Sequence, residues 1–316
     1  MHVSSHFISI DWGTTHFRMR LVATETLEIL WEMQSAQGVK HCFADFNGQS
    51  TWDQQGFFTN FLRTQLLKLP VEHQSFPVVA SGMGSSNIGL CELPYARFPL
   101  DQNGSTLVTK SIPIVRDQNL LLISGIQDGS GMMRGEETQA IGLVEYISSH
   151  SDGWLLLPGT HSKHMAYGNG IFHKFGNYMT GELFQVLGRQ SILATSVEDT
   201  VWDTQVKHAF LEGFTLGSAS GIGKNLLRVR TRDVVGQKNK KDNYFFLSGL
   251  LIGDELGYLK DVGQIIFLAA SGILFELYKT GLETLIGPEQ LVLLDNDTLV
   301  KALLTGQRKM LLNHAG

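Results

Sequence analysis

Cysteine is scarce in this chain, with only Cys42 and Cys91 among 316 residues. Two cysteines allow one disulfide at most, which is not the framework of a small secreted protein, and a reducing cytoplasm fits them better. Long apolar runs are missing as well. The longest, residues 265–275, is interrupted by Ser271-Gly272 and is far shorter than the roughly 20 residues of a membrane-spanning helix. The first residues lack a basic, apolar leader, so we expect neither secretion nor membrane insertion.

An excess of positive charge is also missing. The chain has 25 Lys and Arg against 30 Asp and Glu, a formal net charge of −5, so we expect no nucleic-acid partner. Charged residues make up 17% of the chain and hydrophobic ones 43%, a composition that excludes a mostly disordered protein. At this length, two domains with substantial cores are a better expectation than one.

The first residues of the chain predict an antiparallel meander. Residues 7–10 form a short apolar strand, residues 18–23 a second and residues 27–33 a third. A polar, glycine-containing hairpin, residues 11–15, joins the first two strands. The chemistry of this hairpin makes it the first candidate site.

The hairpin residues suit a phosphate group. Gly13 lets the backbone come close to a ligand and lets successive amides point at an anion. Thr14 and Thr15 add hydroxyl donors, and Asp11 at the strand end suits a hydrated Mg²⁺. The plain alternative is an ordinary hairpin in which Asp and Thr cap the turn. A strand, Asp-x-Gly-Thr-Thr, strand, strand opening resembles that of the actin, hexokinase and heat-shock ATPase superfamily.

The second half of the chain repeats this organisation. After a polar segment, residues 154–157 predict a buried strand and residues 158–163 a second Gly-Thr loop. Residues 164–167 and 171–175 then form a hairpin. Two similar α/β halves, each with a phosphate-sized loop, predict two lobes that face one nucleotide in a cleft able to close like a hinge. The other expected elements are helices at 52–69, after 133–139, from Thr180, Gln205 and Asn243, at 272–279 and from Asn296, and strands at 78–80, 111–115, 265–269 and 291–294.

Three other features are weaker candidates. Residues 217–225 resemble a P-loop, but two positions break the pattern, which favours a glycine-rich helix and its end. The basic stretch 224–241 lacks interleaved aromatic residues, so we expect a solvated loop between helices rather than a polyanion site. His161 and His164 stand three residues apart without a further ligand pair and indicate no metal site.

Over essentially its whole length the chain resembles one family, the 2-dehydro-3-deoxygalactonokinases. The sequences Arg-Gly-Glu-Glu-Thr-Gln and Pro-Gly-Thr-His-x-Lys together make the resemblance specific, whereas Asp-x-Gly-Thr-Thr alone indicates only the superfamily. The matching motifs lie at residues 10–15, 80–83, 133–139, 157–163, 179–183 and 246–253. The sequence departs from the family pattern at residues 268–272 and 294–298, at His16 and at His164.

The resemblance implies a fold, an activity and a setting. The fold is α/β, with two ribonuclease-H-like lobes and a nucleotide cleft between them. Residues 1–140 form the first lobe, completed by a C-terminal helix at 297–316, and residues 141–296 form the second. The implied activity is ATP-dependent phosphorylation of 2-dehydro-3-deoxy-D-galactonate at its terminal hydroxyl, which gives the 6-phosphate and ADP in galactonate or galactose breakdown. Mg²⁺ and a cytoplasmic location are implied too, and a homodimer is an open expectation.

The resemblance and the chemistry of phosphoryl transfer together suggest roles for residues. We expect Glu136 to be the base, because Gly135-Glu136 precedes a helix at the place where related carbohydrate kinases have Gly-Asp. Adjacent helix positions cannot face one point, so we do not expect Glu137 to share this role. The alternative for both is that they favour the positive end of a helix dipole. Asp11 is expected to hold Mg²⁺. The phosphates would be cradled by Gly13, Thr14, Thr15, Gly159 and Thr160.

A 2-keto acid carries a carboxylate, so its pocket should offer a cation. Arg134 is the first choice because a guanidinium clamps a carboxylate with two bonds, and Arg18 and Lys163 are the other cations within motifs. A structural ion pair is the plain alternative for each of them. Gly82 and Met83 are expected on the substrate side. Nucleotide contacts are expected from Ser248, Gly249 and Gly272.

Two other functions stay open at this stage. The same fold could phosphorylate another sugar or sugar acid, or the chain could be a nucleotide-switched interaction protein, as in actin or the heat-shock ATPases. Against the switch, the motifs put a carboxylate where carbohydrate kinases need one. Fold alone does not decide, because function belongs to the site.

Overall fold

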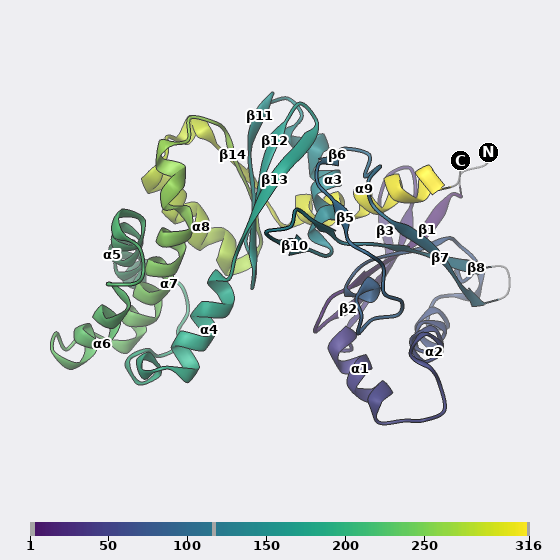
Figure 1. The fold of residues 1–316 in the computed structure, drawn as a ribbon, viewed down its shortest axis with the longest axis horizontal. Coiled ribbons are helices and arrows are strands. Elements are labelled where there is room, and N and C mark those ends of the chain that lie inside the picture. The colour runs from purple at the N-terminus through teal and green to yellow at the C-terminus, as the bar shows by residue number, and fades with distance from the viewer. Residues whose placement is uncertain (1–3, 116–117, 315–316) are drawn as a thin grey trace. The chain divides into compact units, whose positions relative to one another are not determined.

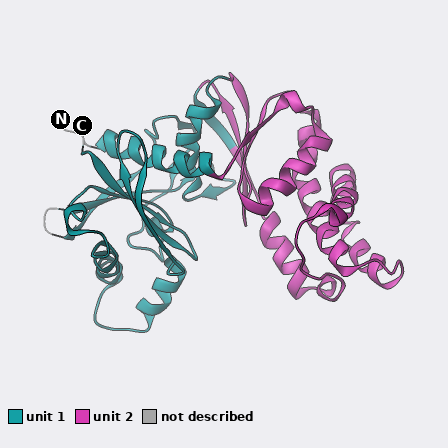
Figure 2. Cartoon of the chain, turned by 180° about the vertical axis from the view of Figure 1, so that it is seen from behind, with its two compact units in different colours: residues 1–149, 170–174, 297–316 teal, residues 150–169, 175–296 magenta. Residues whose placement is uncertain are grey.

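A computed structural model describes residues 4–115 and 118–314 of the chain. The chain divides into two compact units (Figure 2). Within the described residues, unit 1 comprises 4–115, 118–149, 170–174 and 297–314, and unit 2 comprises 150–169 and 175–296. The expected first lobe, 1–140, would have ended inside helix α3 (Glu136–Ile147), whereas unit 1 keeps that helix whole. The last two residues of the expected segment 297–316 lie outside the described part.

Unit 1 is built on a mixed sheet of six strands (Figure 1). They are β1 (His6–Trp12), β2 (Phe17–Ala23), β3 (Ile29–Ser35), β4 (Val78–Gly82), β7 (Thr109–Val115) and β8 (Gln118–Ile123). Their order is β3-β2-β1-β4-β8-β7. β1, β2 and β3 are antiparallel neighbours, which confirms the predicted meander. β4 runs parallel to β1 and β8 parallel to β4, so the carboxyl ends of these three strands meet at one edge. A smaller sheet contains β5 (Ala96–Arg97), β9 (Ile126–Gln127) and β10 (Met132–Met133).

Helices α1 (Val39–Asn47) and α2 (Gln54–Leu66) cover one face of this sheet (Figure 1). Their buried side chains share one core with those of the strands, and Trp12 and Phe58 are fully buried there. α2 begins at Asp53, whose carboxylate accepts a hydrogen bond from the Gly56 amide at 2.7 Å.

The other face carries α3 and the last helix, α9 (Asn296–His314) (Figure 1). Their backbones touch. A Cβ on Gly142 would lie 1.8 Å from the Ala302 carbonyl oxygen, and a Cβ on Gly306 would lie 2.0 Å from that of Thr138. Because only glycine permits such an approach, these two positions bring the C-terminal helix onto unit 1.

Unit 2 has a sheet with the same pattern. Its strands are β11 (Asp152–Leu157), β12 (Ser162–Gly168), β13 (Ile171–Tyr178), β14 (Ile266–Ala269) and β15 (Leu291–Leu294), in the order β15-β14-β11-β12-β13. β12 is antiparallel to β11, while β14 is parallel to β11 and β15 parallel to β14. The first residues of β13 count with unit 1, where they pair with β6 (Leu100–Asp101). The shared strand order confirms the predicted α/β fold with two ribonuclease-H-like lobes.

The helices of unit 2 are α4 (Thr180–Gln190), α5 (Thr204–Ser220), α6 (Leu226–Val234), α7 (Lys240–Leu256) and α8 (Gly272–Leu285). α5 ends at Gly221, which has a positive φ of 72° and whose amide donates a hydrogen bond to the Gly217 carbonyl. This confirms that residues 217–225 are a helix and its end. Across residues 4–115 and 118–314, every helix is too short or too polar to cross a bilayer.

The expectation of a solvated loop at 224–241 is wrong, because α6 occupies its middle. Val229 is fully buried in a core with α5 and α7. The Arg232 guanidinium stacks on the Phe246 ring at 4.1 Å and donates to Glu212 Oε1 at 2.5 Å. These partners come from other helices, so the local composition of the segment did not indicate them.

Candidate active site

The first candidate loop joins β1 to β2, and its backbone is braced by α1. The last strand pair is Trp12 with Phe17, and the Gly13 amide donates to the His16 carbonyl at 2.9 Å. The three carbonyls of residues 13–15 accept hydrogen bonds from the amides of residues 38–40, at 3.0–3.2 Å. A Cβ on Gly38 would lie 2.4 Å from the Thr15 carbonyl carbon, so this close approach needs glycine.

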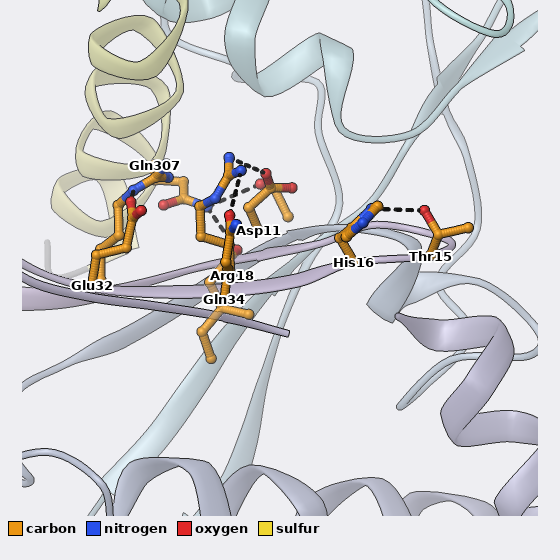
Figure 3. Close-up of polar contacts among 10 residues, drawn as sticks. Asp11, Thr15, His16, Arg18, Glu32, Gln34 and Gln307 are labelled. Carbon is orange, nitrogen blue, oxygen red and sulfur yellow. Dashed lines mark hydrogen bonds and ion pairs between the residues drawn. The ribbon is translucent and has the colours of Figure 1, made fainter. Parts of the chain in front are cut away.

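The hydrogen bonds from residues 38–40 use the carbonyl groups of the loop, and its threonine side chains face solvent. Thr14 and Thr15 are exposed, and the Thr15 hydroxyl lies 2.9 Å from Nδ1 of His16 (Figure 3). A fixed loop with outward hydroxyls suits the predicted phosphate contact. It is equally compatible with a plain hairpin, so the contact stays a prediction.

Asp11 lies near the end of β1, and two arginines act on its carboxylate. Its carboxylate is 3.9 Å from Nη1 of Arg18, whose Nη2 donates to Gln34 Oε1 at 3.0 Å (Figure 3). Burial raises the pKa of Asp11, while the charges of Arg18 and Arg20 lower it and that of Glu136 raises it further. Glu136 is thus within electrostatic range of Asp11.

The parallel pair β1 and β4 places Gly82 beside this carboxylate. Asp11 pairs with Ser81 and Trp12 with Gly82, which has a φ of 94° and would clash with the Trp12 carbonyl oxygen if it carried a Cβ. From the other face, the Gln307 amide of α9 donates to the Ile10 carbonyl and to the Ser81 hydroxyl, both at 2.9 Å. The C-terminal helix therefore fixes the two strand ends that carry the site.

The turn before α3 meets the same strand ends. A Cβ on Gly135, whose φ is 115°, would lie 3.4 Å from the Gly82 Cα. Arg134 donates through Nη1 to the Ser85 carbonyl at 2.6 Å and to its hydroxyl at 2.5 Å, and its guanidinium stacks on Tyr95 at 4.2 Å. Its Nε is buried without a hydrogen-bond partner. The predicted substrate cation thus links this turn to the 3₁₀ segment Met83–Ser85, and Met83 packs on the core of unit 1.

The two neighbouring glutamates have different surroundings. Glu137 is fully buried, and its carboxyl group accepts hydrogen bonds from the Gly135 amide at 2.7 Å and from the Thr138 hydroxyl at 3.2 Å. Burial, with the charge of Glu136 as the second cause, raises the pKa of Glu137 to about 8. Glu136 is only half-buried, and its carboxylate accepts from the Arg134 amide at 3.2 Å. This geometry supports Glu136 over Glu137 as the accessible base.

In unit 2, the second predicted loop follows β11 and is held by α4. The Glu182 amide donates to the Thr160 carbonyl at 3.1 Å, and a Cβ on Gly181 would lie 2.6 Å from the Gly159 carbonyl oxygen. Lys163 is buried, with its Nζ donating to the His161 carbonyl at 2.7 Å. The amine of this predicted substrate cation therefore contacts the loop's own backbone.

A cavity of about 650 Å³ in unit 2 includes this loop in its wall. Three of the predicted residues, Gly159, Thr160 and Ser248, line it, together with Thr180 and Gly181 at the start of α4. The rest of the wall is largely apolar and aromatic, and it comprises Phe184, Val197, Val201, Trp202, Tyr244, Phe245, Leu251, Ile252, Ile273, Leu274, Leu277 and Tyr278, with Gln185, Gly188, Arg189, Asp199 and Thr200.

Two of the residues predicted to contact the nucleotide, Gly249 and Gly272, lie outside the cavity wall formed by the described residues. A Cβ on Gly249 would lie 2.0 Å from the Phe210 carbonyl oxygen, so this glycine permits the close packing of α7 on α5. Gly272 begins α8 with a φ of 56°, one residue before Ile273 in the wall.

Known proteins resemble this chain over the region that contains the candidate site residues. The profile of the 2-keto-3-deoxy-galactonokinase family matches residues 11–305, from Asp11 to a threonine in α9. The chain belongs to this family. A 2-dehydro-3-deoxygalactonokinase of Escherichia coli (strain K12) is 30% identical over 264 residues, 82% of either chain. DgoK1 of Rhizobium meliloti (strain 1021), named a probable 2-dehydro-3-deoxygalactonokinase, is 29% identical over 90% of this chain and 91% of its own.

A solved structure extends the likeness to three dimensions. The crystal structure of a protein from Sinorhizobium meliloti, named a putative 2-dehydro-3-deoxygalactonokinase, superposes with a TM-score of 0.77 at 26% identity, and the match covers 96% of both chains. The match to the 2-keto-3-deoxy-galactonokinase family thus includes both units, and with them the carboxylates of unit 1 and the cavity of unit 2. It confirms the resemblance deduced from the motifs.

Proposed function

We propose that the chain is an ATP-dependent kinase that phosphorylates 2-dehydro-3-deoxy-D-galactonate at its terminal hydroxyl, giving the 6-phosphate and ADP. The observation that carries this proposal is the family match over residues 11–305, in which Asp11, Glu136 and the cavity loop all lie. The role belongs to galactonate breakdown, as the names of the relatives indicate. A cytoplasmic location and a homodimer stay predictions from the sequence.

Unit 1 supplies the acceptor chemistry. Glu136 accepts the proton of the terminal hydroxyl as its oxygen bonds to the γ-phosphorus, while the bond to the β,γ-bridging oxygen breaks and ADP leaves. Glu137 is unsuited to this task, because a carboxyl group with a pKa of about 8 is mostly protonated at pH 7 and is buried away from any substrate. Arg18, close to Asp11, and Arg134, beside Ser85, are the candidate cations for the substrate carboxylate.

Asp11 fits a magnesium ion. Mg²⁺ is usually held by one or two carboxylates together with water and substrate phosphates rather than by an all-protein cage. The Asp11 side chain keeps 39% of its surface accessible at the strand end, and the exposed Thr14 and Thr15 follow it in the loop. When bound, the ion would neutralise charge on the phosphates. Burial raises the pKa of Asp11 on balance, and the charge of the nearby Arg18 partly offsets this shift in favour of the ionised carboxylate that such binding requires.

Unit 2 supplies the nucleotide site. Gly159 and Thr160, with Thr180 and Gly181 at the start of α4, provide small residues, hydroxyls and helix-start amides suited to phosphate oxygens. The apolar and aromatic part of the wall suits a base, and a volume of about 650 Å³ is in the range of small-molecule sites. Ser248 is the polar residue that α7 adds to this wall.

A coupled ADP-release assay tests this function. We expect ATP-dependent ADP release only when 2-dehydro-3-deoxy-D-galactonate is added, and much less with its gluconate epimer or with simple hexoses. Release with another sugar acid alone would keep the kinase and replace the substrate. The nucleotide-switched interaction protein would instead be favoured by two results together. ADP release would not depend on any sugar acid, and exchange of ADP for ATP would change the affinity of the chain for a partner protein.

A further inference from the structure

The hydroxyl of Tyr278 is a junction of four elements inside unit 2. Tyr278 lies on α8 and is 1% exposed. Its hydroxyl donates to Glu255 Oε2 of α7 at 2.7 Å and lies 3.0 Å from the Ser162 hydroxyl at the start of β12. The side chain of Thr180, the first residue of α4, also acts on this hydroxyl. A phenol has one hydrogen to donate, and Tyr278 gives it to Glu255, so the Ser162 hydroxyl is the donor to Tyr278.

Glu255 is held from its other side. Nε2 of His164 donates to Glu255 Oε1 at 2.7 Å, and both side chains are 1% exposed. Nδ1 of His164 lies 2.9 Å from the hydroxyl of Tyr258, in the 3₁₀ segment Gly257–Asp261. A buried carboxylate with hydrogen bonds to both oxygens has little freedom to turn, and it therefore orients the Tyr278 hydroxyl.

The hydroxyls of Ser162 and Thr180, which both act on Tyr278, flank the cavity loop. Ser162 comes two residues after Thr160, and Thr180 precedes Gly181, which packs on the Gly159 carbonyl. Thr180, Tyr278 and Thr160 all lie in the cavity wall, whereas Ser162 lies behind it and is fully buried. Tyr278 thus joins the β12 end of the loop to the helix start that closes over it.

We propose that Tyr278, oriented by Glu255, is a positioning residue that sets the loop 159–160 against the start of α4 and so preorganises the phosphate end of the nucleotide cavity. The inference rests on the proposed function in one respect, namely that the cavity takes a nucleoside di- or triphosphate. Neither glutamate nor tyrosine needs to touch the phosphates. Their effect passes through Ser162 and Thr180, whose backbones adjoin the loop.

The test is ADP binding to the full-length protein by isothermal titration calorimetry. Tyr278→Phe keeps the ring and removes the junction, and we expect the dissociation constant for ADP to rise about tenfold, the effect of one buried hydrogen bond. In turnover, KM for ATP should rise while KM for the sugar acid stays within about twofold, a split that general destabilisation would not produce. Ser162→Ala removes one bond of the junction and should change both quantities in the same direction by less.

Tyr258→Phe is the matched control, because it removes a hydroxyl from the outer end of the same chain of hydrogen bonds without touching the cavity wall. It should leave ADP affinity unchanged. If Tyr258→Phe weakens ADP binding as much as Tyr278→Phe, or if Tyr278→Phe and Ser162→Ala both bind ADP normally, the positioning role is overturned and the proposed function stands. If the unaltered protein binds no ADP, the proposed function itself fails.

Discussion

Glu136 and Glu137 are neighbours in sequence, yet one is half-buried near Asp11 and the other is sealed inside unit 1. The motif alone could narrow the base to this pair, because phosphoryl transfer to a hydroxyl needs a carboxylate. The motif does not show which of the two glutamates is accessible to a substrate, because that depends on how each side chain is buried in the fold. The contacts of Arg134 were equally inaccessible, because Ser85 and Tyr95 lie about 40 to 50 residues earlier in the chain.

Substituting the proposed base should separate chemistry from nucleotide binding. Glu136→Gln keeps the shape and removes the proton acceptor, so we expect kcat to fall by at least about 10²-fold. The dissociation constant for ADP, measured by calorimetry, should stay within about twofold. The matched control is Glu145→Gln on the same helix, where the carboxylate pairs with Lys309 at 3.2 Å and is 46% exposed. A Glu136→Gln enzyme as active as this control would remove Glu136 from the mechanism.

The buried neighbour makes stability depend on pH. The folded-state pKa of Glu137 is about 8 against an ordinary value of 4.5, so the folded state holds a proton that the unfolded state releases between these values. Stability contributed by this group therefore falls as pH rises from about 4.5 to 8, by up to about 1.4 kcal/mol per pH unit. Glu137→Gln resembles the protonated form and should flatten that decline. The free energy of unfolding, measured with urea at pH 5.5 and pH 7.5, gives this decline for both proteins. If the free energy of unfolding changes equally with pH in the two proteins, Glu137 is ionised in the fold.

Among the elements, the hairpins and the central strands followed from local sequence, because apolar residues and turn residues alternate there. α1 was not predicted. Its first amides bond to the carbonyls of residues 13–15, and this long-range capping leaves no signal within residues 39–47. α6 also depends on distant residues, because its packing partners lie on α5 and α7. Gly249 shows the converse, since a glycine inside a family motif serves the packing of α7 on α5.

The contact of α3 with α9 gives a test at the scale of elements. Gly306→Ala forces a methyl group within 2.0 Å of the Thr138 carbonyl oxygen, and we expect a loss of about 1–3 kcal/mol in the free energy of unfolding. Gly188→Ala in α4 is the matched control, because its Cβ would meet only a methyl of Val197 at 3.9 Å. That variant should be neutral or slightly stabilising. Equal stabilities of the two variants by urea unfolding would mean that the helices separate at no cost.

On the scale of the whole molecule, the repeated strand order was within reach of the sequence because each half shows the same succession of strands and polar loops. The cavity wall was not. Its aromatic side chains come from α4, from the segment 197–202, from α7 and from α8, which lie far apart along the chain. The motifs at 157–163, 179–183 and 246–253 reach the wall, whereas the aromatic residues from 197–202 and from α8 lie outside every motif, so sequence could locate one edge of the cavity and not its depth.

The return of α9 to unit 1 also sets an order of events during synthesis on the ribosome. Helix α3 and the strand ends of β1 and β4 await a partner that is translated after nearly all of unit 2. The N-terminal lobe, although made first, can be completed only after unit 2 has been synthesised. Its unsealed sheet face is the surface that a chaperone would meet in the meantime.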